Sequence, residues 1–162
     1  SKHNIIPPDA ILLLTVRSYS DETRNQLLSE IKKISTHTAR AHGATRDPKV
    51  EILDEWTPAA FNDPKWTKAI RTQFQESLGK KNVLRHEPCL GGEDFGRYAR
   101  QLKIPGVMWK LGAAPRKAYA RTGGKGMPGL HSDRWLPEKE PTLQTGMRSA
   151  VTAVLFAFQE KD

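Results

Sequence analysis

Two short stretches of this 162-residue sequence combine a flexible backbone with side chains that could do chemistry. In the first, the adjacent acids Glu93 and Asp94 follow a glycine pair, Gly91 and Gly92. The second holds His131, which follows a glycine-rich segment and precedes an expected helix. Histidine is the commonest metal ligand and the usual general base near neutral pH, and carboxylates orient metal-bound imidazoles. His131 is therefore a candidate ligand or base, and the two acids are candidates to support it or to touch substrate.

Each of these residues also has a purely structural interpretation. A single histidine in a loop is more often simply exposed. Two acids after a glycine pair are ordinary residues at the start of a helix, where the helix dipole favours negative charge. Local rules alone favour this helix-start interpretation of Glu93 and Asp94.

Asn4 and Arg17 flank the first apolar run of the sequence. The guanidinium of an arginine recognises a carboxylate with two parallel hydrogen bonds, and an asparagine amide can donate to a carbonyl oxygen or to a developing oxyanion. Taken one at a time, both residues are more typical of a surface or a turn.

Other catalytic patterns do not occur in the sequence. The stretch 121–129 is rich in glycine but lacks the Gly-x-x-x-x-Gly-Lys-Ser/Thr spacing of a phosphate-binding loop. No Gly-x-Ser-x-Gly is present, and the other four histidines lack ligand spacing such as His-Glu-x-x-His. The single cysteine, Cys89, excludes an intrachain disulfide and a cysteine-based zinc site, and it is compatible with a cytoplasmic protein.

The net charge of +8 brings nucleic-acid binders into consideration, but the basic residues are scattered and form no RNA-binding signature. A solvated basic surface, which could also attract anionic substrates, is favoured. The apolar runs 10–14 and 150–158 are far shorter than the ~20 residues of a membrane span. The first residues show no signal-peptide core, although an exported precursor could have lost one.

An alternation of strands and helices is expected to position these residues. Strands are expected in four apolar runs: 10–17, 49–53, 82–84 and 107–111. Helices are expected in four segments with caps or helical periodicity: 21–42, 64–78, 93–102 and about 141 onward. Residues 112–130 are expected to be a long loop, which in a compact domain is usually functional or disordered. The pattern predicts an α/β fold.

A domain boundary is expected near residues 54–58. It leaves an N-terminal unit of one helix and two strands, which is a thin core because small units bury little surface. We therefore expect this chain to be part of a longer polypeptide, or a unit that needs a partner.

Four stretches together resemble one family. They are NIIPPDAILLLTVRSYSDETR (4–24), PAAFND (58–63), PCLGGEDFGRYARQLKIPGVMWKLG (88–112) and GLHSDRW (129–135). In this order they are similar to segments of the dinuclear-zinc amidohydrolases and metallopeptidases, which include aminoacylase, hippurate hydrolase, indole-acetyl-amino-acid hydrolase and glutamate carboxypeptidase. Leu14 and Cys89 depart from the pattern, where glycine and a small residue such as serine are usual, and we interpret both as tolerated variation.

The resemblance implies a fold and an activity. Residues 1–54 would form the second half of a ferredoxin-like lid and dimerisation domain, and residues 58–162 the C-terminal part of a zinc-peptidase α/β catalytic domain. The complete enzyme would cleave the amide bond of N-acyl or N-aroyl amino acids or small peptides with metal-activated water. It would use two divalent ions, with zinc expected first and manganese, cobalt or nickel as alternatives, and would form a homodimer through the lid.

The resemblance also assigns roles to residues of this chain. His131 would be a metal ligand, and Glu93 and Asp94 would lie behind the substrate pocket. The substrate-binding positions would be four: Asn4 for the carbonyl, Arg17 for the carboxylate, and Gly91 and Gly92 as a wall of the pocket. The general base and the other ligands would lie upstream, so this chain holds no catalytic residue and should be inactive alone. A non-catalytic dimerisation domain or a basic nucleic-acid-binding module is the alternative.

Overall fold

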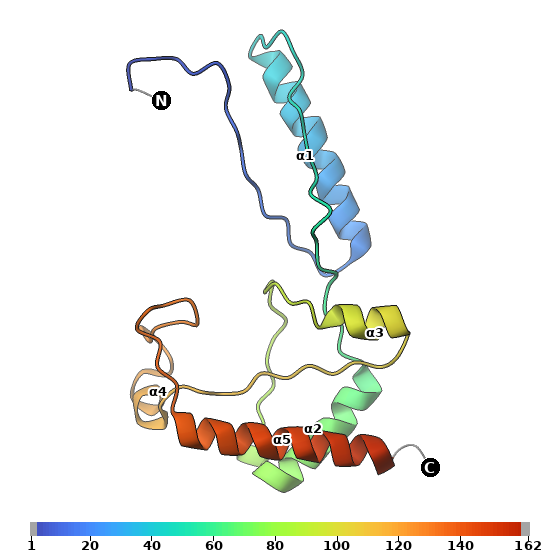
Figure 1. The fold of residues 1–162 in the computed structure, drawn as a ribbon, viewed down its shortest axis with the longest axis vertical. Coiled ribbons are helices and arrows are strands. Elements are labelled where there is room, and N and C mark those ends of the chain that lie inside the picture. The colour runs from blue at the N-terminus through green and yellow to red at the C-terminus, as the bar shows by residue number, and fades with distance from the viewer. Residues whose placement is uncertain (1–2, 160–162) are drawn as a thin grey trace. The chain divides into compact units, whose positions relative to one another are not determined.

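The computed structural model describes residues 3–159, and its regular elements there are all helical (Figure 1). They are α1 (Asp21–Ala41), α2 (Pro64–Leu78), the short 3-10 helix η1 (Lys80–Asn82), α3 (Gly96–Leu102), α4 (Arg116–Thr122) and α5 (Lys139–Gln159). The chain divides into two compact units. The first takes in the residues up to Ala60 together with Cys89–Arg97, and the second takes in Phe61–Pro88 and the residues from Tyr98 onward.

The start of α1 follows from local chemistry. Ser20 is the N-cap, and its hydroxyl accepts a hydrogen bond from the Thr23 amide at 3.1 Å. Asp21 and Glu22 occupy the first turn, where negative charge complements the helix dipole. Gly43 follows the helix at φ +76°, which glycine adopts without strain. The predicted helix is confirmed, but none of its residues is buried.

Helix α2 begins where the Asn62-Asp63-Pro64 sequence predicts. The Asp63 carboxylate accepts a hydrogen bond from the Trp66 amide at 2.9 Å, and Pro64 is the first helical residue. Gly79 ends the helix at φ +88°. This boundary needs only neighbouring residues, so the sequence alone could predict it.

The core of the second unit lies between α2 and α5. Ile70, Phe74 and Ala153 are its buried apolar residues. Aromatic rings meet edge to face around it, since Trp66 lies 5.8 Å from Phe156 and Phe74 lies 5.1 Å from Trp109 between ring centroids.

Asn62 fixes the extended stretch that precedes the long loop. Its side-chain amide donates to the Met108 carbonyl at 2.7 Å, and its oxygen accepts from the Met108 amide at 2.8 Å. The Asp63 amide also donates to the Gly106 carbonyl at 2.9 Å. One side chain thus satisfies the backbone of Met108 as a neighbouring strand would.

The four predicted strands are wrong for the described residues 3–159, where no strand forms at 10–17, 49–53, 82–84 or 107–111. A strand needs a second strand that pairs with it through backbone hydrogen bonds, and within that range none of these segments has one. In consequence Ile11, Leu12, Leu13 and Leu14 expose between 65% and 93% of their surface. The expected α/β lid and catalytic arrangement is therefore not confirmed by the helices seen here.

Two helix predictions need a smaller correction. The helix expected from residue 93 begins at Gly96, where a β-carbon would lie 2.8 Å from the Ala60 α-carbon, an approach that only glycine allows. The expected loop 112–130 contains α4. Between residues 3 and 159, no helix is long and apolar enough to cross a membrane.

Candidate functional site

Arg17 contacts the glycine-pair loop, which lies 73 residues away from it at Leu90. Its Nη1 donates a hydrogen bond to the Leu90 carbonyl oxygen at 2.8 Å. The side chain stays exposed, and a guanidinium has five N–H donors. Arg17 can therefore hold the loop and still offer donors to an anion in solution.

Gly92 has a spatial reason to be glycine. A β-carbon at this position would lie 3.3 Å from Arg17 Nη1 and 3.9 Å from its Cζ. At Gly91 the nearest atom would be Cys89 Sγ at 3.7 Å, which is an ordinary van der Waals distance. Of the two glycines, only Gly92 lies against the guanidinium, so a side chain at this position would crowd it.

Glu93 and Asp94 are exposed and make local hydrogen bonds. The Glu93 carboxylate accepts from the Phe95 amide at 3.1 Å, and the Asp94 carbonyl accepts from the Arg97 amide at 2.9 Å. Both residues precede α3 and shape the turn into it. The helix-start interpretation thus accounts for their contacts, with the helix beginning at Gly96.

Asn4 lies in an exposed turn of the first unit. Among the described residues no hydrogen bond links it to Arg17 or to Leu90. The structure therefore joins two of the predicted substrate-binding regions, Arg17 and the glycine pair, and does not join Asn4 to them.

His131 belongs to the second unit and is exposed. It lies in a turn that is closed by the Ser132 amide, which donates to the Gly129 carbonyl at 3.0 Å. Within residues 3–159 no group of three His, Cys, Asp or Glu side chains could hold a metal ion. Since a zinc site needs at least three protein ligands, His131 could supply only one of them.

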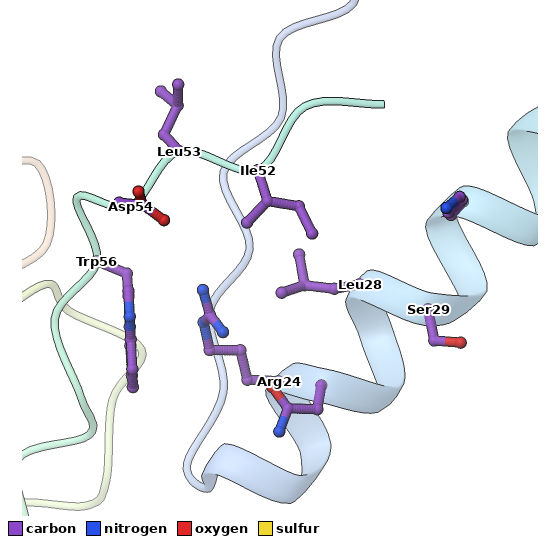
Figure 2. Close-up of a pocket in the computed structure, with 9 residues that line it drawn as sticks. Arg24, Leu28, Ser29, Ile52, Leu53, Asp54 and Trp56 are labelled. Atoms are coloured by element: carbon purple, nitrogen blue, oxygen red, sulfur yellow. The ribbon is translucent and has the colours of Figure 1, made fainter. Parts of the chain in front are cut away.

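A groove lies beside α1 in the first unit, between the helix and the residues that return along it (Figure 2). Leu28 and Ile52 face each other across it, and Trp56 closes one end. The Arg24 guanidinium lies 4.2 Å from the centroid of the Trp56 ring, a cation–π contact. The sequence reasoning missed Arg24 and Trp56, because 32 positions separate them and no motif joins them.

Arg97 supports the same region, because its guanidinium donates to the Trp56 carbonyl. Trp56 is thus bound from α1 by Arg24 and from the start of α3 by Arg97. These contacts connect the glycine-pair segment to α1 within the first unit.

Residues 6–122 match the model of Peptidase family M20/M25/M40. This match takes in well over half of the 162 residues, so the chain belongs to that family. The family resemblance predicted from the four motif stretches is confirmed.

Individual relatives agree with this assignment. The chain is 32% identical over 114 residues to a Bacillus subtilis (strain 168) protein named as an amidohydrolase, YhaA, and this similarity covers 70% of the chain and 28% of that protein. It is 31% identical over 117 residues to Thermostable carboxypeptidase 2 of Saccharolobus solfataricus, covering 72% and 28%. It is 28% identical over 143 residues to the N-acetyldiaminopimelate deacetylase of Enterococcus faecalis, covering 86% and 33%.

The extent of these matches bears on the site residues. The family match includes Arg17 and the stretch from Gly91 to Asp94, but not Asn4 or His131. The similarity to the Enterococcus faecalis deacetylase covers 86% of the chain, and any continuous stretch of that length must include His131. The chain spans about 28% of the length of the first two relatives.

Proposed function

We propose that this chain is the C-terminal portion of a metal-dependent amidohydrolase that cleaves the amide bond of N-acyl or N-aroyl amino acids or small peptides. Three relatives are named as an amidohydrolase, a carboxypeptidase and a deacetylase, which supports amide hydrolysis as the general reaction. The observation that carries the proposal is the contact of Arg17 with the glycine-pair loop.

Arg17 and Gly92 would form the carboxylate-binding part of the site. The exposed guanidinium would bind the substrate carboxylate through two parallel hydrogen bonds, which fix orientation as well as adding affinity. Its bond to the Leu90 carbonyl restricts where the guanidinium can lie. Gly91 and Gly92 would let the backbone approach the substrate closely.

Asn4 would stabilise the charge that develops on the carbonyl oxygen of the scissile amide. Glu93 and Asp94 would lie behind this pocket, where their own contacts shape the turn before α3. The proton-accepting carboxylate would come from the upstream part of the polypeptide, so this chain supplies binding and orientation.

His131 would contribute one ligand to the metal centre. The described residues do not form that centre by themselves, so we place its other ligands in the rest of the polypeptide. When two divalent ions, which we expect to be zinc, are bound there, they would supply a water molecule that is deprotonated near neutral pH.

The two parts of the chain would serve different domains. Residues 1–54 would complete the lid and dimerisation domain, and residues 58–162 would complete the catalytic domain. Exposed apolar side chains support the need for further partners, among them Ile34 at 63% and Leu13 at 93% exposed. A homodimer would form through the lid.

The proposal is tested by comparing the complete polypeptide with this chain alone. Hydrolysis of hippurate and N-acetyl amino acids is measured with zinc, manganese or cobalt added. We expect turnover by the complete polypeptide and none by the 162 residues alone. Turnover by the 162 residues would contradict the assignment of the missing ligands, and inactivity of the complete polypeptide would contradict the proposed reaction.

A further inference from the structure

The excess of basic over acidic residues in the chain equals the number of basic residues in one acid-free segment. Residues 95–132 hold eight Lys and Arg and no Asp or Glu. The remaining 18 Lys and Arg are balanced by the 18 Asp and Glu of the chain, so the net charge of +8 belongs to this segment. A segment without acids between Asp94 and Asp133 carries a local excess of positive charge.

Four of these cations share a closed loop with His131. The Glu138 amide donates to the Ala113 carbonyl at 2.8 Å, and the Arg116 amide donates to the Glu138 carboxylate at 3.2 Å. These bonds join the two ends of residues 114–137, which we call the basic loop. It carries α4 and the glycine-rich stretch that leads to His131 (Figure 1). Its four cations before His131 are Arg116, Lys117, Arg121 and Lys125.

The four cationic side chains of the basic loop are accessible to solvent. All four side chains are exposed, and among residues 3–159 none of them forms an ion pair. Lys117 and Arg121 stand four positions apart on α4, so they lie on one face of the helix.

An anion would meet side chains here, and not backbone amides. The Gly123 amide donates to Tyr119, and the amides of Gly124 and Lys125 donate to the side chain and carbonyl of Thr122. These three amides therefore donate to groups within the same turn. This excludes the phosphate-binding-loop geometry, in which such amides point at the ligand.

Small carboxylates fit this surface better than nucleic acid does. Proteins that bind single strands add aromatic rings on which bases stack. The one aromatic residue of α4, Tyr119, has its ring edge against Gly124, where a β-carbon would lie 3.1 Å away. Tyr119 keeps 52% of its surface exposed, but α4 offers no second ring for a neighbouring base, whereas separate exposed cations suit scattered carboxylate groups.

We propose that the basic loop attracts substrates with a second anionic group, such as a carboxylate on the acyl part, and steers them toward His131. This inference rests on the proposed function, in which Arg17 takes the carboxylate of the amino-acid part. Electrostatic steering of this kind raises association rates and weakens as salt screens the charges.

The binding test uses this chain and three ligands: N-succinylglycine, N-acetylglycine and N-acetylglycinamide. Backbone amide NMR shifts are followed at low salt. We expect shifts at Lys117 and Arg121 that are largest for the succinyl ligand and disappear in K117E/R121E. The matched control is K65E/K68E, which changes the net charge equally at two exposed lysines of α2. An equal loss in both variants would overturn the proposal, since net charge alone would then explain binding.

The same titration with a single-stranded oligonucleotide tests the alternative that the basic loop binds nucleic acid. Oligonucleotide binding at the basic loop that exceeds succinyl binding and falls linearly with log salt would overturn the carboxylate proposal.

The kinetic test uses the complete polypeptide. In K117E/R121E, kcat/KM for N-succinylglycine should fall about tenfold relative to N-acetylglycine, with kcat unchanged and the effect shrinking as salt is raised. K65E/K68E should leave this ratio within about twofold. If K117E/R121E leaves the ratio of the two kcat/KM values unchanged, the inference about the basic loop is overturned and the proposed function is not. Failure to hydrolyse either substrate would overturn the proposed function, while the NMR result would still decide the inference.

Discussion

Arg17 lies against Gly92, with its Nη1 3.3 Å from the position that a β-carbon on residue 92 would occupy. The same nitrogen donates to the Leu90 carbonyl at 2.8 Å, and this hydrogen bond ties the guanidinium to the loop. Seventy-five positions separate the two residues, and the family motifs that contain them are distinct. Their contact brings together two sequence stretches that we propose bind the substrate carboxylate.

Gly92→Ala tests this arrangement most simply, because the added methyl group would require the guanidinium to shift by a few tenths of an ångström. In the complete polypeptide we expect KM for hippurate to rise about tenfold, which corresponds to about 1.4 kcal/mol of lost binding. Gly112→Ala is the matched control, since nothing lies within 4 Å of its added carbon. Equal effects of the two substitutions would contradict the spatial role given to Gly92.

Gly96→Ala should destabilise this chain. Its β-carbon would lie 2.8 Å from the Ala60 α-carbon and 3.1 Å from the Ala59 carbonyl oxygen, and backbone atoms cannot move aside cheaply. We expect a loss of about 1–3 kcal/mol in the free energy of unfolding, measured with urea. Gly129→Ala is the control, since nothing lies within 4 Å of its added carbon. A loss no larger than that of the control would show that α3 does not approach Ala60 so closely.

Asn62→Ala should also destabilise the chain, because it removes two hydrogen bonds to the Met108 backbone. The groups left without partners cost about 1–3 kcal/mol in the free energy of unfolding. The neighbouring Asp63→Ala loses only the cap of α2, worth about 1 kcal/mol. If Asn62→Ala leaves the Met108 amide as protected from hydrogen exchange as before, the side chain is not what holds residues 106–109.

The ion pair of Arg40 and Asp47 makes a prediction about pH. Arg40 Nε donates to one carboxylate oxygen at 2.8 Å and Nη2 to the other at 2.6 Å. The hydrogen bond from Arg40 is the main cause that lowers the pKa of Asp47. A lowered pKa in the folded state means that the stabilising effect is present above about pH 3.9, the usual pKa of an unfolded aspartate. It is lost as pH falls through the folded-state pKa of Asp47.

This pair can be followed at the Asp47 carboxyl carbon by NMR. We expect its titration midpoint to lie below 3.9 in the wild-type chain and to rise toward that ordinary value of about 3.9 in Arg40→Gln. Glu30→Gln, which removes a separate pair with Lys33, should leave the midpoint unchanged. An identical midpoint with and without Arg40 would contradict the predicted cause.

The helix starts could be predicted from the sequence because their causes are local. Ser20 and Asp63 each cap a helix through an amide three residues later, and such spacing is visible in the sequence. The predicted strands could not form without neighbours, so the apolar run at Ile11–Leu14 remains exposed. The start of α3 lies later than predicted, at Gly96, whose close approach to Ala60 is a tertiary contact with no sequence signal.

The candidate site shows the same division. The types of Arg17, Asn4 and His131 suggested binding and metal ligation, and the family match confirms the origin of the segment that holds Arg17. The approach of Arg17 to Gly92 depends on how the chain folds back and could not be read from spacing. The long loop 112–130 was predicted from the sequence, but the two hydrogen bonds that Glu138 makes with Ala113 and Arg116 to close it have no sequence signal.

The central claim, that Arg17 binds the substrate carboxylate, is tested most directly by kcat/KM of the complete polypeptide for hippurate and for its amide, hippuramide. We expect Arg17→Ala to lower kcat/KM for hippurate by about 10- to 100-fold, since a charge-assisted hydrogen bond is worth about 1.5–3 kcal/mol. Arg17→Ala should change kcat/KM for the amide, which lacks the carboxylate, by less than about threefold. An equal fall for both substrates would contradict the role of Arg17 as the carboxylate-binding residue.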